Sequence, residues 1–296
     1  MKRALITGIH GFTGQYLAQS LRAAGYRVFG TALSPSAEEQ DVIAVDLSDR
    51  DAVQRMAEEV QPDVVVHLAA IAFVAHSDIE AMYRVNLLGT RHLLEALAGL
   101  ANKPSAVLLA SSANIYGNAE VEPISEAVAP APANDYAVSK LAMEYMARLW
   151  MERLPITIVR PFNYTGQGQH ENFLLPKIVS HFKRGARDIE LGNLHVWRDF
   201  SDVRMVVDSY CRLVELGGEL AGQTFNVCSG MGHSLGEVLD MMAGIAGYRI
   251  NVSVNPAFVR SNEVVRLVGS NAKLQAAIGT LHQRPLAETL RWMYER

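Results

Sequence analysis

The sequence predicts an α/β protein built on a doubly wound parallel sheet, together with a smaller α/β lobe. Strand-like apolar runs alternate with helix-like stretches over residues 1–160, an order typical of a parallel sheet with helices on both faces. The runs VVV at 64–66 and AVLLA at 106–110 are apolar throughout, as expected of strands buried on both faces. A glycine-rich turn at 8–14 follows the first strand-like run directly.

The elements of this first part are expected in a regular order. Tyr16, Leu17 and Leu21 stand at helical spacing and predict a helix after the glycine-rich turn. This helix is expected to begin near Phe12 and to be closed by Gly25. The strands are expected at 4–7, 26–32, 41–46, 64–68, 106–111 and 156–160, and the other helices at 49–59, 80–100 and 136–152.

After Pro161 the pattern changes. Residues 163–197 are rich in Gly, Gln, His and Asn and contain one helix-like stretch, 175–184. FNVCSG at 225–230 predicts another buried strand, and the last part mixes helices with a strand near 250–254.

Two domains are therefore expected. The first comprises residues 1–162 plus about 199–229, because the chain is expected to cross back to the first sheet near 204–227. The second comprises about 163–198 plus 230–296.

Composition excludes several classes of protein. A chain of 296 residues, 49% of them hydrophobic, can bury a sizeable core, and a net charge of −4 does not suggest a nucleic-acid surface. Cys211 and Cys228 form no C-x-x-C pair, so no disulfide framework is implied. The nine histidines form no H-x-x-x-H pattern, so no metal site is expected.

No targeting or membrane segment is expected either. The longest nearly apolar run, 64–75, is interrupted by His67 and falls well short of the roughly 20 residues that span a membrane. Two basic residues lead straight from the start into a strand, so no signal peptide is expected and a cytoplasmic protein is predicted.

Gly8, Gly11 and Gly14 give the turn the spacing G-x-x-G-x-x-G. Glycines let a backbone turn tightly and approach a pyrophosphate closely, and the amides of the following helix then face the phosphates. Alone the spacing is a weak signal, because glycines also occupy plain turns. The strand before it and the helix after it favour a Rossmann-type dinucleotide site.

Tyr136 and Lys140 form a Y-x-x-x-K pair that lies on one face of a predicted helix. A phenol has a pKa of about 10, and a nearby ammonium moves it toward working pH. An ordinary helix also carries such a pair, but Ser112 stands in a turn directly after the strand 106–111. Ligands of doubly wound sheets bind at that edge, so Ser112 is placed to hydrogen-bond a substrate oxygen.

Taken together, these motifs resemble those of the extended short-chain dehydrogenases/reductases, and the resemblance runs nearly end to end. It implies a nicotinamide dinucleotide cofactor and a catalytic triad of Ser112, Tyr136 and Lys140. The matching segments are TGIHGFTG, Asp46-Leu47, HLAA at 67–70, NLLGT at 86–90, SSANIYG, YAVSK, RPFNYTGQGQ and RDFSDV.

The resemblance also implies which residues bind the cofactor. The glycine loop would carry the pyrophosphate, Asp46 and Leu47 the adenine, and Asn86 a structural or nicotinamide-side contact. The full set is Gly8, Gly11, Phe12, Thr13, Gly14, Ala32, Asp46, Leu47, Leu68, Ala69, Ala70, Asn86, Tyr136 and Lys140.

Within that group, the segments LGNL…RDFSDV, NVCSG and VRSNEVVRLVGSNAKL most resemble the GDP-4-keto-6-deoxy-mannose reductases. This implies NAD(P)H-dependent reduction of the C4 ketone of GDP-4-keto-6-deoxy-D-mannose, giving GDP-D-rhamnose or its C4 epimer, GDP-6-deoxy-talose. The implied substrate residues are Asn163, Asn172, Lys177, Arg198, Arg260 and Glu263.

Other roles for these residues stay open. Two arginines suit two phosphates, but Arg198 would also pair with Asp199 or Asp202, and Arg260 with Glu263. Lys177 would equally suit a solvated helix face. His76 is expected to cap a helix or to touch substrate, and His10 to fill its turn.

Departures from the family pattern reduce the number of candidate reactions. Dehydratases carry acidic residues just after the catalytic hydroxyl, where this chain has Ala113 and Asn114, so 4,6-dehydration is not expected. The cysteine that fucose-synthesising relatives place at this turn is absent there. A nucleotide-sugar 4-epimerase with bound NAD remains an alternative. A dinucleotide-sensing binding protein is a third hypothesis, which the intact catalytic set disfavours.

The cofactor's ribose is harder to assign. No acid and no arginine stand near Ala32, where relatives bind the ribose, and Thr31 or Ser34 would donate to a 2′-phosphate. NADPH is therefore favoured, with NADH also accepted. On the catalytic helix, Met143, Tyr145, Met146, Leu149 and Trp150 are expected in the core, or in part at the face of a homodimer.

Overall fold

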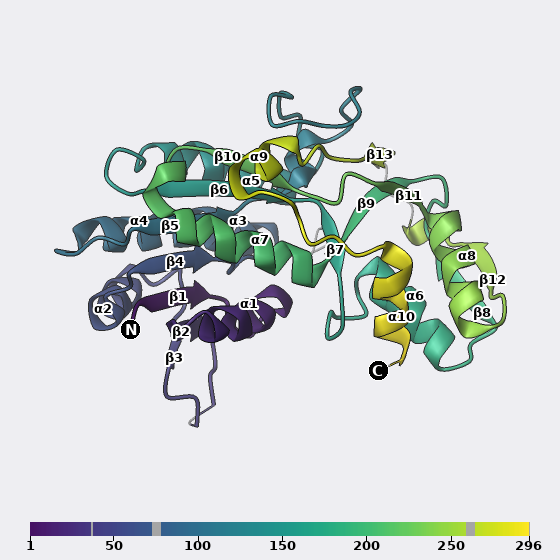
Figure 1. Cartoon of the computed structure of the whole chain (residues 1–296), viewed down its shortest axis with the longest axis horizontal. Helices are drawn as coiled ribbons and strands as arrows, with labels where there is room; N and C mark the ends of the chain where they lie inside the picture. The colour runs from purple at the N-terminus through teal and green to yellow at the C-terminus, as the bar shows by residue number, and fades with distance from the viewer. Residues whose placement is uncertain (37, 73–77, 259–263, 296) are drawn as a thin grey trace. The chain divides into compact units, whose positions relative to one another are not determined.

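The computed structural model describes residues 1–36, 38–72, 78–258 and 264–295 (Figure 1). The chain forms two compact units. The first consists of Met1–Ile115, Asn134–Arg160 and Val207–Phe225, and the second of Tyr116–Ala133, Pro161–Val206 and Asn226–Arg296.

A seven-stranded parallel sheet is the centre of the first unit, which confirms the predicted fold class. Its order is β10-β6-β5-β4-β1-β2-β3, so the direction of chain progression reverses between β1 and β4. Every residue of β4 is buried, as its unbroken apolar sequence predicts. The strands are β1 Arg3–Thr7, β2 Arg27–Ala32, β3 Val42–Ala44, β4 Val64–His67, β5 Ala106–Ala110, β6 Ile156–Pro161 and β10 Thr224–Val227.

Helices cover this sheet. α2 packs on α4 and α4 on α5, over a core that includes Leu93, Val107 and Ile156. α1 lies against β1 and β2, and Figure 1 draws α1 and α7 in front of the strands. The helices are α1 Phe12–Ala23, α2 Arg50–Val60, α3 Ile79–Tyr83, α4 Thr90–Gly99, α5 Asp135–Arg148 and α7 Val203–Leu216, with the single turns η2 Ala113–Tyr116 and η3 Gly217–Leu220.

Two expected helices differ from the structure. The helix expected over 80–100 is interrupted by a π-helical segment, η1, over Arg84–Gly89. The helix expected over 136–152 ends at Arg148, because the chain then folds back through turns such as Trp150 N–H to Ala147 O at 2.9 Å. π-Helical turns such as η1 often occur at functional sites.

The second unit is built from short strands and three packed helices. β9 pairs with β7, β11 and β13, while β12 pairs with β8. Ile178, Val238 and Leu290 from α6, α8 and α10 are fully buried in its core. Its elements are β7 Asn163–Thr165, α6 Leu174–Lys183, β8 Asp188–Leu191, β9 Trp197–Asp202, β11 Gly232–Ser234, α8 Leu235–Ala246, β12 Asn251–Val254, η4 Pro256–Phe258, β13 Arg266–Leu267, α9 Ala272–Ile278 and α10 Leu286–Glu295.

The two units divide the chain differently from the expected domains. Residues 116–133, expected in the first part, belong to the second unit. The reason lies in their contacts: Glu122 makes a two-bond ion pair with Arg266 at 2.6 and 2.7 Å, and Ile124 N–H donates to Val268 O at 2.9 Å. Residues 199–206 and 226–229 also belong to the second unit.

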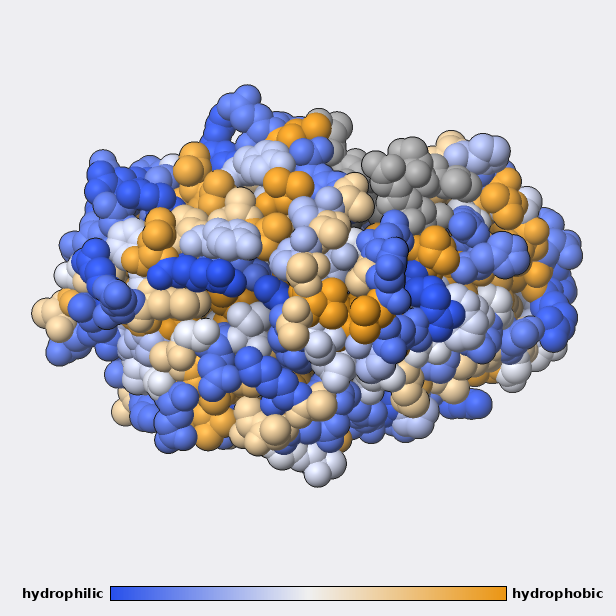
Figure 2. All heavy atoms as spheres, turned by 90° about the horizontal axis from the view of Figure 1, so that it is seen from above, coloured by the Kyte–Doolittle hydropathy of each residue, from blue (hydrophilic) through white to orange (hydrophobic). Residues whose placement is uncertain are grey.

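The surface mixes polar and apolar residues. Figure 2 shows hydrophobic residues interspersed with hydrophilic ones over the face that it presents. Among the helices of the described ranges, none is long and apolar enough to cross a membrane.

Candidate active site

The glycine turn forms a cradle that only glycine fits. Gly8 has a φ of +70°, and a Cβ there would lie 3.0 Å from Ala69 Cα. A Cβ on Gly14 would lie 2.6 Å from both Gly8 O and Ile9 O, and one on Gly11 would lie 3.1 Å from Gly8 O. Side chains at Gly11 and Gly14 would collide with the backbone of the turn, and one at Gly8 would collide with the segment after β4. The cradle therefore fits a pyrophosphate at the N-terminus of a twelve-residue helix.

The predicted cofactor residues gather at the carboxyl edge of the sheet in the first unit. Leu68 and Ala69 follow β4, and their N–H groups donate to Thr7 Oγ1 at 3.1 Å each. Asp46 follows β3, and Oδ1 accepts from the N–H and the hydroxyl of Ser48, which lowers the Asp46 pKa. The others at this edge are Phe12 and Thr13 in the first turn of α1, Ala32 ending β2, Leu47 after β3 and Ala70 after β4.

The end of β2 differs in detail from the expectation. Thr31 is buried and its hydroxyl oxygen accepts from Gly8 N–H at 3.4 Å, so of the two predicted hydroxyls only Ser34 is exposed. Sequence reasoning missed Glu39, whose carboxylate lies 2.8 Å from His10 Nε2 and accepts from Ser36 N–H at 2.9 Å. His10 therefore links the glycine turn to an acid seven residues beyond β2, a contact without a signal in local spacing.

Ser112 lies two residues after the end of β5 and is buried. Its Oγ accepts hydrogen bonds from the N–H and the Nδ2 of Asn114, both at 3.2 Å. Because two donors already face the oxygen, the Ser112 hydroxyl proton is left to point to another acceptor. Asn114, at the position where dehydratases are expected to carry an acid, therefore occupies the acceptor side of the Ser112 oxygen.

Tyr136 and Lys140 lie in the first turns of α5. Asn134 begins this helix, since its side chain accepts from Ala137 N–H at 2.9 Å. The Lys140 ammonium is buried and donates to Ala110 O, the last residue of β5, at 2.9 Å. Burial lowers the Lys140 pKa to about 8, and the charge of Glu144 opposes that effect. The helix is thereby held to the strand end that carries Ser112.

A buried histidine ties β1 to the π-helical segment. The Thr90 hydroxyl donates to Asn86 O at 2.8 Å, so its oxygen accepts from His67 Nε2, also at 2.8 Å. His67 Nδ1 then accepts from the Thr7 hydroxyl at 2.7 Å. Burial, helped by the charge of Lys140, lowers the His67 pKa to about 3, so the ring stays neutral.

Asn86 lies in the π-helical segment and bridges two parts of the site. Its Oδ1 accepts from Ile71 N–H at 2.8 Å, and its Nδ2 donates to Ser139 Oγ at 3.0 Å. Ser139 in turn donates to Tyr136 O at 2.8 Å. Asn86 therefore links the segment after β4 to α5.

The predicted substrate residues that lie within the described ranges all belong to the second unit. Asn163 begins β7, Asn172 precedes α6, and both are exposed. Lys177 of α6 donates to Glu190 O at 2.8 Å and lies 4.4 Å from the Phe258 ring centroid, so it is not simply solvated.

Arg198 of β9 donates to Trp197 O at 2.9 Å and to Val265 O at 3.3 Å. The carboxylates of the alternative ion pair have other partners: Asp199 accepts from Ser229 and Gly230 N–H groups at 2.8 Å each.

The second of these carboxylates, Asp202, binds Arg204 and Thr289. Three further predicted residues, Arg260, Glu263 and His76, lie outside the described residues. Within the described ranges, no group of three or more His, Cys, Asp or Glu is arranged to hold a metal ion.

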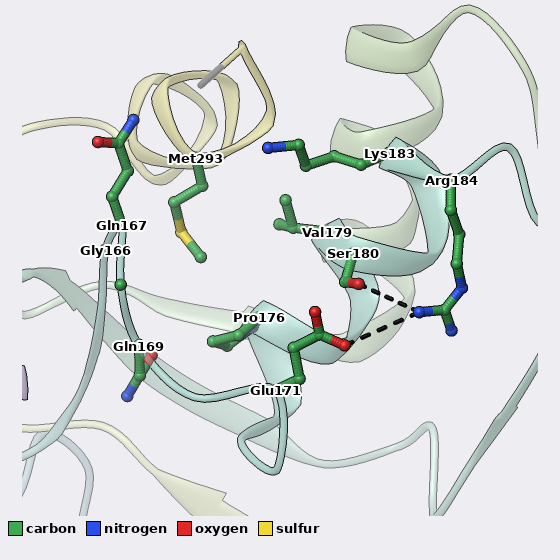
Figure 3. A pocket seen from close by; sticks show the side chains of 11 residues that line it. Gly166, Gln167, Gln169, Glu171, Pro176, Val179, Ser180, Lys183, Arg184 and Met293 are labelled. Carbon is green, nitrogen blue, oxygen red and sulfur yellow. Dashed lines mark hydrogen bonds and ion pairs between the residues drawn. The ribbon is translucent and has the colours of Figure 1, made fainter.

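A pocket of about 490 Å³ lies in the second unit, and Glu171 and Pro176, which adjoin Asn172 and Lys177 in sequence, line it. Figure 3 shows Lys183 of α6 extending over it toward the helix that carries Met293, while Arg184 contacts Ser180 and Glu171 at the rim. Neither Asn172 nor Lys177 lines the pocket, so it is distinct from the predicted substrate residues.

Comparison with known proteins identifies relatives along the whole chain. Residues 4–228 match the model of the NAD dependent epimerase/dehydratase family. GDP-6-deoxy-D-talose 4-dehydrogenase of Aggregatibacter actinomycetemcomitans is 35% identical over 278 residues, covering 94% of this chain and 91% of the relative. GDP-6-deoxy-D-mannose reductase of Pseudomonas aeruginosa is 35% identical over 301 residues, covering 98% and 95%.

Solved structures agree with this match. RMD from Pseudomonas aeruginosa, complexed with NADPH, has a TM-score of 0.86 at 33% identity and covers 100% of this chain and 98% of its own. A Burkholderia cenocepacia J2315 structure, described provisionally as an epimerase, has a TM-score of 0.92 at 54% identity, covering 99% and 97%. MoeE5 in complex with UDP-glucuronic acid and NAD has a TM-score of 0.87 at 26% identity, covering 99% and 98%.

The family predicted from the sequence is thus confirmed by a match over most of the chain and by relatives at 35% identity over nearly all of it. The chain belongs to the NAD dependent epimerase/dehydratase family of extended short-chain dehydrogenases/reductases.

Proposed function

We propose that this protein reduces the C4 ketone of GDP-4-keto-6-deoxy-D-mannose to an alcohol with NADPH. Family membership and the two GDP-sugar relatives make it an NAD(P)-dependent oxidoreductase of nucleotide sugars. One observation supports this reaction above the others: the buried Lys140 ammonium donates to Ala110 O. Ala110 lies two residues before Ser112, and Lys140 lies one helical turn after Tyr136. This supports Tyr136 as the proton donor and Ser112 as the hydroxyl donor, because ligands of such sheets bind at this edge.

In this reaction Ser112, Tyr136 and Lys140 have different roles. Ser112 donates its hydroxyl proton to the carbonyl oxygen and orients the ketone, since Asn114 already occupies its oxygen. Tyr136 transfers its phenolic proton to the oxygen as negative charge develops on it. The positive charge of Lys140 stabilises the phenolate that remains. When bound, the nicotinamide supplies the hydride for C4.

In this proposal the second unit holds the GDP moiety. Arg198 supplies a guanidinium for the diphosphate, which suits bidentate recognition of phosphate oxygens. Lys177, Asn163 and Asn172 belong to the same predicted set. Arg260 and Glu263, outside the described residues, complete it.

For the cofactor, NADPH is proposed over NADH. No acidic residue ends β2, Ser34 is exposed just beyond it, and the related RMD structure contains NADPH. An acidic side chain near the ribose would favour NADH. The Glu39 carboxylate is near the glycine turn, but it already contacts His10.

A homodimer is also proposed. Val138 and Tyr145 of α5 and Leu149, the residue that follows it, have exposed side chains, Leu149 at 79% exposure. Their spacing of seven and four residues places them along one side of the helix, as in a helix-pairing interface.

The decisive experiment incubates the protein with GDP-4-keto-6-deoxy-D-mannose and NADPH and determines the product by NMR. Stoichiometric NADPH oxidation with formation of GDP-D-rhamnose or GDP-6-deoxy-talose supports the proposal, and the C4 signal distinguishes the two products. Purified protein that retains NAD and interconverts C4 epimers without net oxidation would support the epimerase alternative instead. Dinucleotide binding without turnover of either substrate would favour the sensor hypothesis.

A further inference from the structure

Two buried charges that the mechanism does not use lie close to the catalytic lysine. Glu144 of α5 is 1% exposed and Arg160 of β6 is 4% exposed. Arg160 Nε donates to Glu144 Oε1 at 3.0 Å and its Nη2 donates to Oε2 at 2.7 Å. Both carboxylate oxygens are therefore held by one rigid guanidinium, which fixes the position of the negative charge.

Glu144 follows Lys140 by four residues, so the two side chains share a face of α5. The buried charges thus alternate in sign from Lys140 to Glu144 to Arg160. An ammonium in the protein interior loses its hydration, which disfavours the protonated form. For Lys140 burial lowers the pKa to about 8, and the negative charge of Glu144 acts in the opposite direction.

The other groups near Lys140 give it no anionic support. His67 faces it from β4 and stays neutral, because its pKa is lowered to about 3. Tyr136 lies one turn before it on α5, and Ala110 of β5 offers a neutral carbonyl. Arg160 of β6 is cationic and binds the Glu144 carboxylate. Among the described groups around this ammonium, Glu144 is the anion.

We propose that Glu144, held by Arg160, is a positioning residue that keeps the Lys140 ammonium protonated in its buried site and so sets the upper pH limit of the reaction. The link to turnover rests on the proposed function, but the effect on Lys140 itself does not. Without Glu144, no described anion would offset the burial of the Lys140 ammonium, and its proton would pass to solvent at lower pH.

The test uses three variants of the full chain. Glu144→Gln removes the charge and keeps the shape. Glu144→Gln leaves Arg160 buried without a carboxylate, so this single variant is at risk of unfolding. The double variant Glu144→Gln/Arg160→Met therefore removes both charges together. Glu95→Gln is the matched control, since Glu95 also accepts two bonds from one arginine, Arg50, at 3.1 and 2.6 Å, but at the surface.

The first measurement follows Lys140 directly. Lysine labelled with ¹³C and ¹⁵N gives an NMR signal that is assigned by its loss in Lys140→Met, and its midpoint is titrated in each variant. Glu144→Gln should lower the midpoint by at least about one pH unit, the double variant should lower it less, and Glu95→Gln should leave it unchanged.

The second measurement is the pH profile of kcat/KM for the ketone with NADPH. In Glu144→Gln the alkaline limb should move down by the same interval as the NMR midpoint, with activity recovering toward pH 6. A merely structural role would lower activity at every pH and leave the limb in place.

An unchanged Lys140 midpoint in the folded Glu144 variants overturns the inference, whether or not the enzyme reduces the ketone. A lowered midpoint without a moved alkaline limb overturns its link to catalysis. A lowered midpoint in a protein whose wild type does not turn over the ketone supports the electrostatic role of Glu144 and refutes the proposed function.

Discussion

Replacing Gly14 by Ala adds a single methyl group and tests whether the glycine turn is the cradle that binds the pyrophosphate of the cofactor. The new Cβ would lie 2.6 Å from Gly8 O, 2.6 Å from Ile9 O and 2.8 Å from Ile9 C. All three are backbone atoms of the turn, so no side chain can rotate away. Either α1 retreats from the turn or the turn opens, and forced shifts of this kind cost about 1–3 kcal/mol.

The same displacement should weaken cofactor binding, because the amides at the N-terminus of α1 would no longer meet the pyrophosphate. A loss of about 1.4 kcal/mol corresponds to a tenfold rise in Kd. NADPH binding is measured by fluorescence titration and stability by thermal unfolding. Gly14→Ala is expected to raise Kd at least about tenfold and to lower Tm by several degrees.

Gly99→Ala is the matched control. Gly99 ends α4, its φ is not positive, and a Cβ there would meet nothing within 4 Å. The same glycine-to-alanine change should leave the NADPH Kd unchanged and should not lower Tm. A Gly14→Ala protein that binds NADPH within twofold of wild type, with an unchanged Tm, would refute the assignment of the cradle.

Four further expectations follow. Tyr136→Phe should lower kcat by about 10²–10⁴ with NADPH affinity kept, and a variant with more than about half the rate is incompatible with its role as proton donor. Lys140→Met should lose activity and bind NADPH more weakly. Its Tm relative to wild type should also be more favourable at pH 7 than at pH 10, because burying the Lys140 charge costs stability that is recovered as pH rises through about 8; a pH-independent difference contradicts this. Arg198→Ala should lower kcat/KM for the GDP-sugar about tenfold without affecting NADPH binding, whereas a fall in Tm alone returns Arg198 to a structural role. Leu149→Glu should convert a dimer to a monomer in sedimentation measurements, and an unchanged sedimentation coefficient excludes this face of α5.

Much of the first unit was determined by the sequence alone. The apolar run 64–66 predicts a strand buried on both faces, and the alternation of strands with helices predicts a parallel sheet, as the structure has them. Gly25 closes α1 with a φ of +86°, as a helix-ending glycine does. Gly14 and the Tyr136–Lys140 pair are recognisable because their chemistry depends on local spacing, which sequence displays directly.

Only the tertiary structure decided the contacts between distant segments. Glu144 and Arg160 are an ordinary helix residue and an ordinary strand residue until folding buries them against each other. The π-helical turn that carries Asn86 likewise escapes local pattern, since it is stabilised by hydrogen bonds to Ile71 and Ser139.

The same limit explains why the compact units differ from the expected domains at 116–133, and why the contact between Glu39 and His10 was missed. Spacing along the chain specifies which side chains share a face of one element. Which faces meet depends on burial and hydrogen bonding summed over the whole fold, and no short segment of sequence contains that sum.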